Sequence, residues 1–240
     1  MIIGRKPILE AIQGGKQIDR IFMLSSATGE SIQDIRDLAF KHNIPINKVP
    51  AEKLNSLSNG SHQGCIAIAA SVQYHNLQEV ISFITEKGET PLFVMLDGVT
   101  DVRNIGAIAR TALCCGAQAM VIADKGVGAL NEDAIKTSAG ALEKIYICRV
   151  NSLMKAVDEM HLNGIKVFAS EMTAQAKLHD LPLTEPACVI LGGEEKGVFT
   201  GLMKICDTTF QIPMPGAFES LNVSVAAGMI LYEAVRQRLQ

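Results

Sequence analysis

Three short polar segments each follow an apolar run, and each leads into a stretch with helical spacing. The first, residues 97–106, precedes Arg110, an arginine flanked by apolar residues. The second is the glycine-rich segment 191–197, and the third is residues 212–222. In a parallel α/β sheet, loops at the carboxyl ends of the strands meet at one ligand crevice. The three segments together therefore predict a single binding site.

Arg110, which follows the first segment, has unusual neighbours in the sequence, because apolar residues flank it. A guanidinium among apolar neighbours needs a buried carboxylate, a phosphate ligand or a route to solvent. Asn104 precedes it by six residues, somewhat less than two helical turns, so the two side chains lie on different but neighbouring parts of the helix surface. The pattern leaves open whether Arg110 is a salt-bridged surface residue or a ligand-binding group.

The glycines of the second segment suggest that a ligand approaches the backbone closely, because Gly192 and Gly193 directly follow an apolar strand signal. The spacing of Gly192 and Gly197 resembles a P-loop, but the lysine and the Ser/Thr that would hold phosphate and magnesium are absent. We therefore reject an NTPase. A Rossmann-like dehydrogenase is weakly supported, because no Gly-x-Gly-x-x-Gly follows a strand. A plain turn with a solvated Glu194 remains an alternative.

The third segment is predicted to be a rigid loop between a strand and a long terminal helix. Two prolines fix φ in this loop, and Gly216 permits an unusual backbone conformation or close approach of a ligand. Ser220 is a good candidate for the N-cap of a helix that starts near Leu221. These features fit a tight strand–helix connection as well as a ligand loop.

The composition is that of an ordinary folded protein, with 48% apolar and 20% charged residues among 240. No apolar run approaches the roughly 18 residues of a membrane span, and the N-terminus lacks the order of a signal peptide. The six cysteines form no Cys-x-x-Cys pair, and the five histidines show no metal spacing. We expect a cytoplasmic protein with buried free thiols, no membrane contact and no metal.

The net charge of −3 does not favour nucleic acid as a partner. The charge is uneven, however, because residues 1–75 carry eight Lys and Arg against six Asp and Glu. The N-terminal part is therefore the better candidate for contact with a polyanion, although an ordinary solvated surface explains this small excess equally well.

The apolar patterns predict two domains, 1–70 and 78–240, joined by a linker at 71–77. The first is a compact α/β unit. In the second, continuous apolar strands alternate with helices, which indicates a parallel sheet covered by helices on both faces. Its predicted helices are residues 77–86, 104–115, 131–139, 152–163, 200–205 and 221–239, and its predicted strands are 91–96, 119–122, 145–148, 165–169, 187–191 and 208–212.

The three segments resemble the three motifs of the SpoU (TrmH-like) branch of the SPOUT RNA methyltransferases. The matching stretches are residues 104–112, 191–197 and 212–226, in family order and with family-like spacing. The opening residues 4–8 and the turn at 62–64 resemble the small N-terminal substrate-binding domain of many members, which is itself similar to a small RNA-binding ribosomal protein. The resemblance is strongest to the enzymes that methylate a guanosine of 23S rRNA.

This resemblance implies methylation of a ribose 2′-hydroxyl with S-adenosyl-L-methionine, a trefoil knot at the C-terminus, and a homodimer with its site near the interface. The positions that match cofactor-binding residues are Gly192, Gly193, Ile212 and Leu221, largely through backbone groups. The positions that match the catalytic polar set are Asn104, Arg110, Glu194, Ser220 and Asn222. The chain departs from its relatives at Gly193, where alanine is frequent, and at Glu195 and Lys196, where small or acidic residues are common.

The chemistry needs a donor or cation beside the 2′-oxygen, because negative charge develops there during methyl transfer. Arg110 fits this role and can also bind an RNA phosphate in a bidentate manner. An arginine is normally always charged, so we leave removal of the proton unassigned. Two alternatives stay open: a tRNA 2′-O-methyltransferase, and a non-catalytic RNA-binding or ribosome-assembly protein on the same fold.

Overall fold

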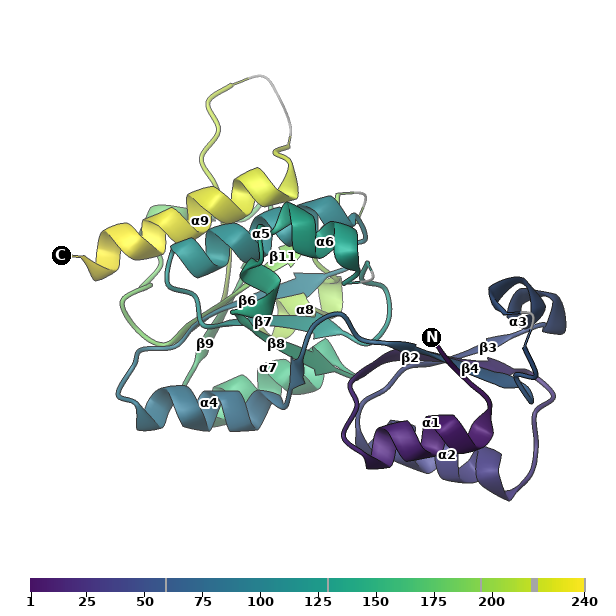
Figure 1. The fold of residues 1–240 in the computed structure, drawn as a ribbon. Coiled ribbons are helices and arrows are strands. Elements are labelled where there is room, and N and C mark those ends of the chain that lie inside the picture. Colours follow the sequence, from purple (N-terminus) through teal and green to yellow (C-terminus); the bar gives the residue numbers. More distant parts are fainter. Residues whose placement is uncertain (59, 129, 195, 217–219, 240) are drawn as a thin grey trace. The chain divides into compact units, whose positions relative to one another are not determined.

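The computed structural model describes residues 1–58, 60–128, 130–194, 196–216 and 220–239. They form two compact units, Met1–Gln73 and Tyr74–Gln240, and each unit has a hydrophobic core of its own (Figure 1). Among the predicted positions, Glu195 and residues 217–219 of the third segment lie outside the described residues.

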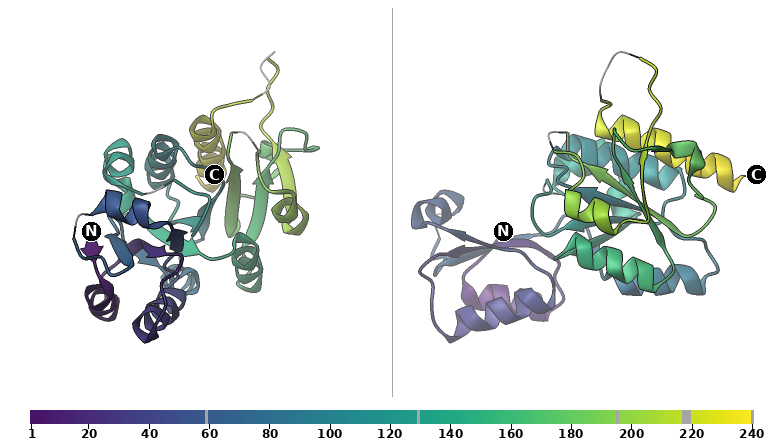
Figure 2. Two further views of the ribbon diagram at one scale, coloured as in Figure 1. Left: turned by 90° about the vertical axis from the view of Figure 1, so that its right-hand side faces the viewer. Right: turned by 180° about the vertical axis from the view of Figure 1, so that it is seen from behind.

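The smaller unit is a four-stranded sheet with helices packed against it (Figure 2). Strand β4 lies between β1 and β2 and is antiparallel to both, while β3 is parallel to β2. Ile8 and Ile12 of one helix and Ile32 and Ile35 of another recur at helical spacing and are buried against the sheet. The elements are β1 (Ile2–Ile3), α1 (Arg5–Gln13), β2 (Ile18–Leu24), α2 (Glu30–Lys41), β3 (Ile46–Val49), α3 (Ala51–Leu57) and β4 (Cys65–Ala69).

The larger unit contains an eight-stranded sheet in its described residues, in the order β10-β12-β9-β11-β6-β7-β8-β5, and every pairing in it is parallel. Its strands are β5 (Tyr74–His75), β6 (Leu92–Asp97), β7 (Ala119–Ala123), β8 (Tyr146–Val150), β9 (Lys166–Ser170), β10 (Ala176–Lys177), β11 (Ala187–Gly192) and β12 (Thr208–Gln211). Its helices are α4 (Leu77–Glu86), α5 (Val102–Cys114), α6 (Glu132–Thr137), α7 (Leu153–Leu162), α8 (Thr200–Ile205) and α9 (Val223–Arg238), with short 3₁₀ helices η1 (Ala141–Glu143) and η2 (Leu178–Asp180).

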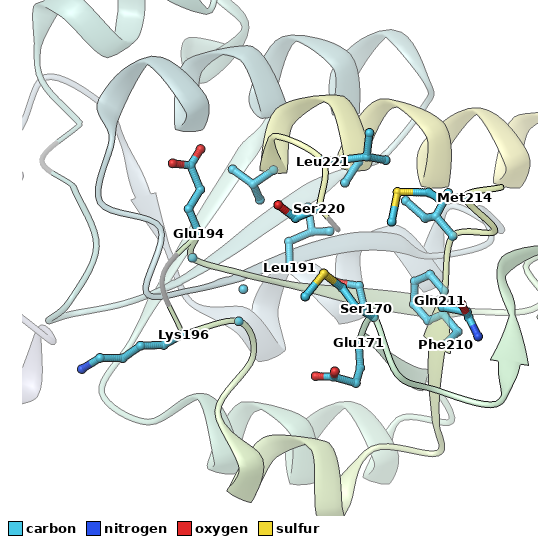
Figure 3. A pocket seen from close by; sticks show the side chains of 17 residues that line it. Ser170, Glu171, Leu191, Glu194, Lys196, Phe210, Gln211, Met214, Ser220 and Leu221 are labelled. Carbon is cyan, nitrogen blue, oxygen red and sulfur yellow. The ribbon is translucent and has the colours of Figure 1, made fainter. Parts of the chain in front are cut away.

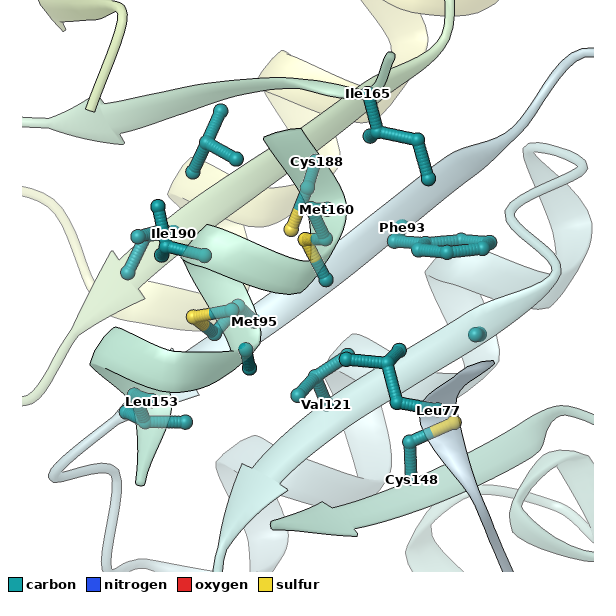
Figure 4. Close-up of a cluster of buried hydrophobic side chains, with 14 of the residues drawn as sticks. Leu77, Phe93, Met95, Val121, Cys148, Leu153, Met160, Ile165, Cys188 and Ile190 are labelled. Atoms are coloured by element: carbon teal, nitrogen blue, oxygen red, sulfur yellow. The ribbon is translucent and has the colours of Figure 1, made fainter. Parts of the chain in front are cut away.

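Helices cover both faces of this sheet, which confirms the predicted fold class (Figure 1). Helices α4, α7 and α8 pack on one face and α5, α6 and α9 lie on the other. Phe93 and Met95 of β6, together with Ile190 of β11, point into the core beneath α7, whose Met160 fills the same space (Figure 4). The central strands are continuously apolar because neither face meets water.

The structure corrects two local predictions. Ser220 is not the N-cap of the last helix: α9 begins at Val223, and its N-cap is Asn222, whose side-chain oxygen accepts the backbone N–H of Ser224 at 2.9 Å. Cys114 is exposed at the end of α5, so not every cysteine is a buried apolar residue. Burial does raise the pKa of the Cys65 thiol to about 11 and that of Cys148 to about 12. The trefoil knot stays a prediction.

Candidate active site

The three predicted segments meet at the carboxyl-terminal edge of the large sheet. Asp97 ends β6 and Gly192 ends β11, and these two residues are register partners in neighbouring parallel strands. Strand β12, which leads into the third segment, is separated from β11 only by β9. Loops that are far apart in the sequence therefore open on one edge of the sheet, as the rule for parallel sheets requires.

Glycines allow the second segment to fold tightly against the first. Gly193 and Gly197 pair with each other, and the N–H of Gly197 donates to the carbonyl of Gly193 at 2.9 Å. A Cβ atom at Gly192 would overlap the backbone of Gly197, and one at Gly193 would overlap the carbonyl of Gly98. An alanine at position 193 would therefore displace the first segment in this chain. The Asp97 carboxylate also accepts the N–H of Phe199 at 2.7 Å, which ties the two segments together.

Asn104, Glu194 and Asn222 form a hydrogen-bonded group that we call the polar triad. Asn104 donates its side-chain amide to Glu194 Oε1 at 3.1 Å. Asn222 donates to the same Glu194 oxygen at 3.0 Å and to the Asn104 side-chain oxygen at 3.1 Å. The three predicted segments each contribute one member, so this triad joins residues that lie up to 118 positions apart. The polar triad holds the Glu194 carboxylate at the sheet edge, where Asn104 and Asn222 both donate to it.

A first pocket of about 330 Å³ opens beside the triad (Figure 3). All four predicted cofactor residues line it, together with the predicted catalytic residues Glu194 and Ser220. Much of its wall is apolar or glycine backbone, whereas Glu171 and Glu194 bring negative charge. Its lining residues are Ser170, Glu171, Met172, Leu191, Gly192, Gly193, Glu194, Lys196, Gly197, Phe210, Gln211, Ile212, Met214, Ser220, Leu221, Val223 and Ala226.

A second pocket of about 660 Å³ lies next to the first, and Gly193, Glu194, Lys196, Gly197 and Val223 line both. The rest of its wall comes from the end of β6 and the loop after it, the start of α5, the loop after β7, and the residues leading into α8. Those residues are Asp97, Gly98, Val99, Thr100, Asp101, Asn104, Gly126, Val198, Phe199 and Thr200.

The acidic residues of the second pocket already have partners. Asp97 accepts the N–H of Phe199, and Asp101 is both the N-cap of α5 and the ion-pair partner of Arg103, at 3.1 Å. Hydrogen bonds from the Arg103 side chain and backbone N–H lower the pKa of Asp101. Glu194 is bound by the two amides of the polar triad.

Arg110 lies apart from the other predicted catalytic residues. It is exposed on α5, it lines neither pocket, and it makes no hydrogen bond or ion pair with any residue that the structure describes. Its apolar neighbours Ile108, Ala109 and Ala112 are buried on the opposite side of the helix, so the guanidinium has a route to solvent. The structure thus brings together Asn104, Glu194 and Asn222, and within one chain leaves Arg110 outside.

Sequence reasoning missed one wall of the first pocket. Ser170 ends β9, Glu171 and Met172 follow it, and Gln211 and Met214 come from β12 and the loop after it. A signal for the first group was present, because residues 165–169 read as a strand of the same parallel sheet and its following loop had to reach the same edge. Lys196, which lines both pockets, was noted only as a departure from the family pattern.

The described residues contain no cluster of three or more His, Cys, Asp or Glu side chains that could hold a metal ion. No helix in the same ranges is long and apolar enough to cross a membrane. The pockets offer glycine backbone, apolar side chains, carboxylates, amides and the Lys196 ammonium as their recognition groups.

Comparison with known proteins gives two family matches. Residues 91–232 match the SpoU rRNA Methylase family, and residues 1–75 match the family described as RNA 2′-O ribose methyltransferase substrate binding. The chain is 33% identical to "Putative TrmH family tRNA/rRNA methyltransferase YacO" of Bacillus subtilis, over 99% of this chain and 95% of that protein.

Two solved structures resemble the chain in fold and sequence. The SpoU methyltransferase AviRb of Streptomyces viridochromogenes, solved with AdoMet, is 26% identical and has a TM-score of 0.62, with 99% of this chain and 89% of that chain covered. The TrmH/SpoU tRNA modifying enzyme of A. aeolicus is 29% identical and has a TM-score of 0.56, with 68% of this chain and 84% of that chain covered.

Proposed function

The chain belongs to the SpoU family of RNA methyltransferases, and we propose that it transfers a methyl group from S-adenosylmethionine to a ribose 2′-hydroxyl of RNA, on a guanosine of 23S rRNA. The observation that carries this proposal is the polar triad beside the first pocket. A carboxylate and two amides from three distant segments converge at the wall of a cavity of ligand size.

The first pocket fits S-adenosylmethionine in its chemistry. Gly192 and Gly193 have no room for a Cβ, so backbone rather than side chains faces the ligand there. Leu191, Ile212 and Leu221 give the apolar surface that an adenine ring needs, and the carboxylates of the pocket favour a ligand with positive charge. When bound, the cofactor supplies a methyl group on a positively charged sulfur.

The protein's own residues then position the acceptor. Asn104 and Asn222 fix the Glu194 carboxylate. The Asn104 amide keeps one N–H and one lone pair for a ribose hydroxyl, whereas the donors and lone pairs of Asn222 are engaged by Glu194, Asn104 and Ser224. Holding the 2′-oxygen in line with the methyl group lowers the activation barrier by several kcal/mol. In favourable cases, orientation of the reactants supplies about 7–11 kcal/mol. Ser220, on the wall of the first pocket, is placed to orient the ribose or the loop backbone. Removal of the hydroxyl proton has no assigned base.

In this proposal, Arg110 stabilises the charge that develops on the 2′-oxygen and anchors an RNA phosphate. Because Arg110 lines neither pocket of its own chain, we propose that the protein is a homodimer in which Arg110 completes the partner's site. Helices α5 and α9 pack side by side (Figure 1). Val225, Met229 and Tyr232 recur at helical spacing on α9 and are 48%, 46% and 67% exposed. A second copy that covered this apolar stripe would also cover the neighbourhood of Arg110.

Subunit complementation tests the shared site. An Arg110→Ala chain and a Glu194→Gln chain are each expected to be inactive alone. If Arg110 serves the partner's pocket, mixed dimers contain one intact site and regain activity. Size-exclusion chromatography with light scattering, on the wild type and on Met229→Asp, checks that the dimer exists and that α9 makes it.

Ribosomal RNA is favoured over tRNA by the two-unit organisation. The predicted 1–70 domain corresponds to the match with a substrate-binding family, and residues 1–75 carry a small excess of positive charge. The solved tRNA modifying enzyme, in contrast, covers only 68% of this chain.

Incubation with tritiated S-adenosylmethionine and unmodified transcripts of 23S rRNA or tRNA separates the substrates: we expect label in the rRNA. Label in tRNA alone would contradict that choice, and RNA binding without label would indicate a non-catalytic protein.

A further inference from the structure

The second pocket, which adjoins the first and has no assigned ligand, contains a cation at its boundary. Among the described residues that line the two pockets, Lys196 is the one with a positively charged side chain. It is exposed and makes no hydrogen bond or ion pair with any described residue. A free ammonium beside two cavities is a binding group without a partner among the described residues.

The described carboxylates of the second pocket are engaged elsewhere and do not pair with Lys196. Asp97 accepts a backbone N–H, Asp101 pairs with Arg103, and Glu194 accepts the amides of the polar triad. These contacts hold the carboxylates in place and leave the ammonium of Lys196 available for an anion from outside the chain.

The backbone that carries Lys196 is held in place. Gly197, the residue after it, has a positive φ of 62° and its N–H donates to Gly193, while the Phe199 N–H is bound by Asp97. Figure 3 shows the Lys196 side chain pointing away from Ser220 and Leu221, on the far side of the glycine segment from those residues of the first pocket. The direction of the side chain suits a ligand outside the cofactor pocket.

We propose that the second pocket receives the target nucleoside of the RNA and that Lys196 binds a backbone phosphate next to its ribose. This proposal rests on the proposed methyl transfer, because a 2′-oxygen must meet the methyl group at the wall shared by the two pockets. The phosphate on the adjacent 3′-oxygen then lies close to the same wall. A lysine there contributes affinity without reading sequence, since phosphate contacts position the nucleic acid and base contacts specify it.

Protection from acylation tests the contact directly on the full-length protein. The lysines are acetylated with N-hydroxysuccinimidyl acetate in the protein alone, in the protein with S-adenosylmethionine, and in the protein with the 23S rRNA or tRNA transcript. Mass spectrometry then quantifies the acetylation of each lysine. Lys204, which is exposed on α8 and lines neither pocket, is the internal control. RNA is expected to protect Lys196 and not Lys204. Equal protection of both, or of neither, would overturn the proposal, and this result does not depend on methyl transfer being detected.

A matched pair of variants gives the functional arm. Lys196→Met is expected to weaken RNA binding about tenfold, the effect of losing one charge-assisted hydrogen bond. It should also make the slope of log affinity against log salt shallower by about 0.7–1, the contribution of one phosphate. Lys196→Arg should restore both quantities, and Lys204→Met should change neither. If Lys196→Met instead weakened S-adenosylmethionine binding and left the RNA salt slope unchanged, the lysine would belong to the cofactor and the proposal would be wrong.

Discussion

Asn222 performs two tasks with one amide group. Its oxygen caps α9 by accepting from Ser224, and its nitrogen donates to Glu194 and Asn104. The start of the last helix and the geometry of the polar triad are therefore set by the same side chain. A substitution of Asn222 can weaken both the stability of α9 and the geometry of the polar triad, and the balance between the two effects should depend on the new side chain.

Asn222→Asp should separate the two tasks. Aspartate is an equally good N-cap, so the free energy of unfolding should fall little. It cannot donate, however, and it would set a second carboxylate beside Glu194, so methyl transfer should be lost. Asn222→Ala should lose activity and also about 1 kcal/mol of stability. Thermal unfolding and methyl-transfer rates measure the two effects, and an active Asn222→Asp enzyme would contradict the role of the triad.

Arg110→Ala should abolish methylation and leave S-adenosylmethionine binding nearly intact. The guanidinium lines neither pocket, so its removal takes away charge stabilisation at the acceptor and no contact with the cofactor. Arg103→Ala is the matched control, because Arg103 lies on the same helix and is also exposed. Isothermal calorimetry measures cofactor affinity. Loss of cofactor binding with Arg110 would show that its assigned role is wrong.

At the scale of elements, α9 is fastened at both ends by different chemistry. Asn222 caps its start, and Arg238 in its last turn donates to four backbone carbonyls, those of Leu183, Thr90, Pro91 and Glu185, at 2.8–3.1 Å. The carbonyls follow η2 or precede β6 and β11. One guanidinium thus joins the terminal helix to the amino-terminal edge of the sheet, opposite the site.

Arg238→Met should therefore destabilise the fold by about 2–3 kcal/mol, because several carbonyls lose a charged donor. Arg236→Met is the control from the same turn. Arg236 is 47% exposed and its ion pair with Glu233 reaches solvent on that side, so its loss should cost about 1 kcal/mol, less than that of Arg238. Chemical denaturation measures both variants. Equal stability losses would show that the carbonyl contacts of Arg238 are not special.

The stability difference between the wild type and the Arg236→Met control should depend on pH in a defined direction. Hydrogen bonds from Arg236 and Gln237 lower the pKa of Glu233 from 4.5 to about 2. A carboxylate with a depressed pKa stabilises the fold above its unfolded pKa and loses that effect as the pH falls through the folded value. The stability gap between wild type and Arg236→Met should therefore close between pH 4.5 and pH 2.

Most elements of the larger unit could be read from the sequence, except β5, which lies in the predicted linker, and the short β10; the contacts between elements could not. Apolar periodicity located the strands and helices of the larger unit because those residues face a continuous core. The cap was placed at Ser220 because serine and asparagine are similar N-caps and local sequence does not choose between them. The triad bond between Asn104 and Glu194 joins residues 90 positions apart, and no periodicity reports such a pair. For Arg110 the sequence left three alternatives open: a buried carboxylate partner, a phosphate ligand or a route to solvent. The structure shows an exposed side chain, which is the third of these.

At the scale of the whole molecule, strand order and chain threading are what the sequence patterns leave open. Alternating helices and strands indicate a parallel sheet, but many strand orders share that pattern. The order β10-β12-β9-β11-β6 places the three site-bearing loops, which follow β6, β11 and β12, within four consecutive strands of the sheet. The trefoil knot and the boundaries 1–70, 71–77 and 78–240 stay predictions, and Tyr74–His75 within the predicted linker form β5 of the larger sheet.

The 1–70 domain should govern RNA affinity. A chain of residues 71–240 contains every strand of the large sheet and its core, so it should retain S-adenosylmethionine binding. Its affinity for the RNA substrate should fall by at least an order of magnitude, because the separate substrate-binding contacts are gone. Filter binding of both chains to the same RNA measures this. If residues 71–240 bound RNA as tightly as the full chain, the first domain would not be the RNA-binding one.

The position of the transferred methyl group on the RNA tests the proposed reaction most directly. The full-length protein is incubated with tritiated S-adenosylmethionine and unmodified 23S rRNA, and the RNA is then hydrolysed in alkali. A 2′-O-methyl group blocks cleavage of the adjacent phosphodiester, so the label should appear in an alkali-resistant dinucleotide that begins with guanosine, and Arg110→Ala should give none. Label confined to mononucleotides, which would place the methyl group on a base, or an RNA left unlabelled by the wild type, would contradict the account.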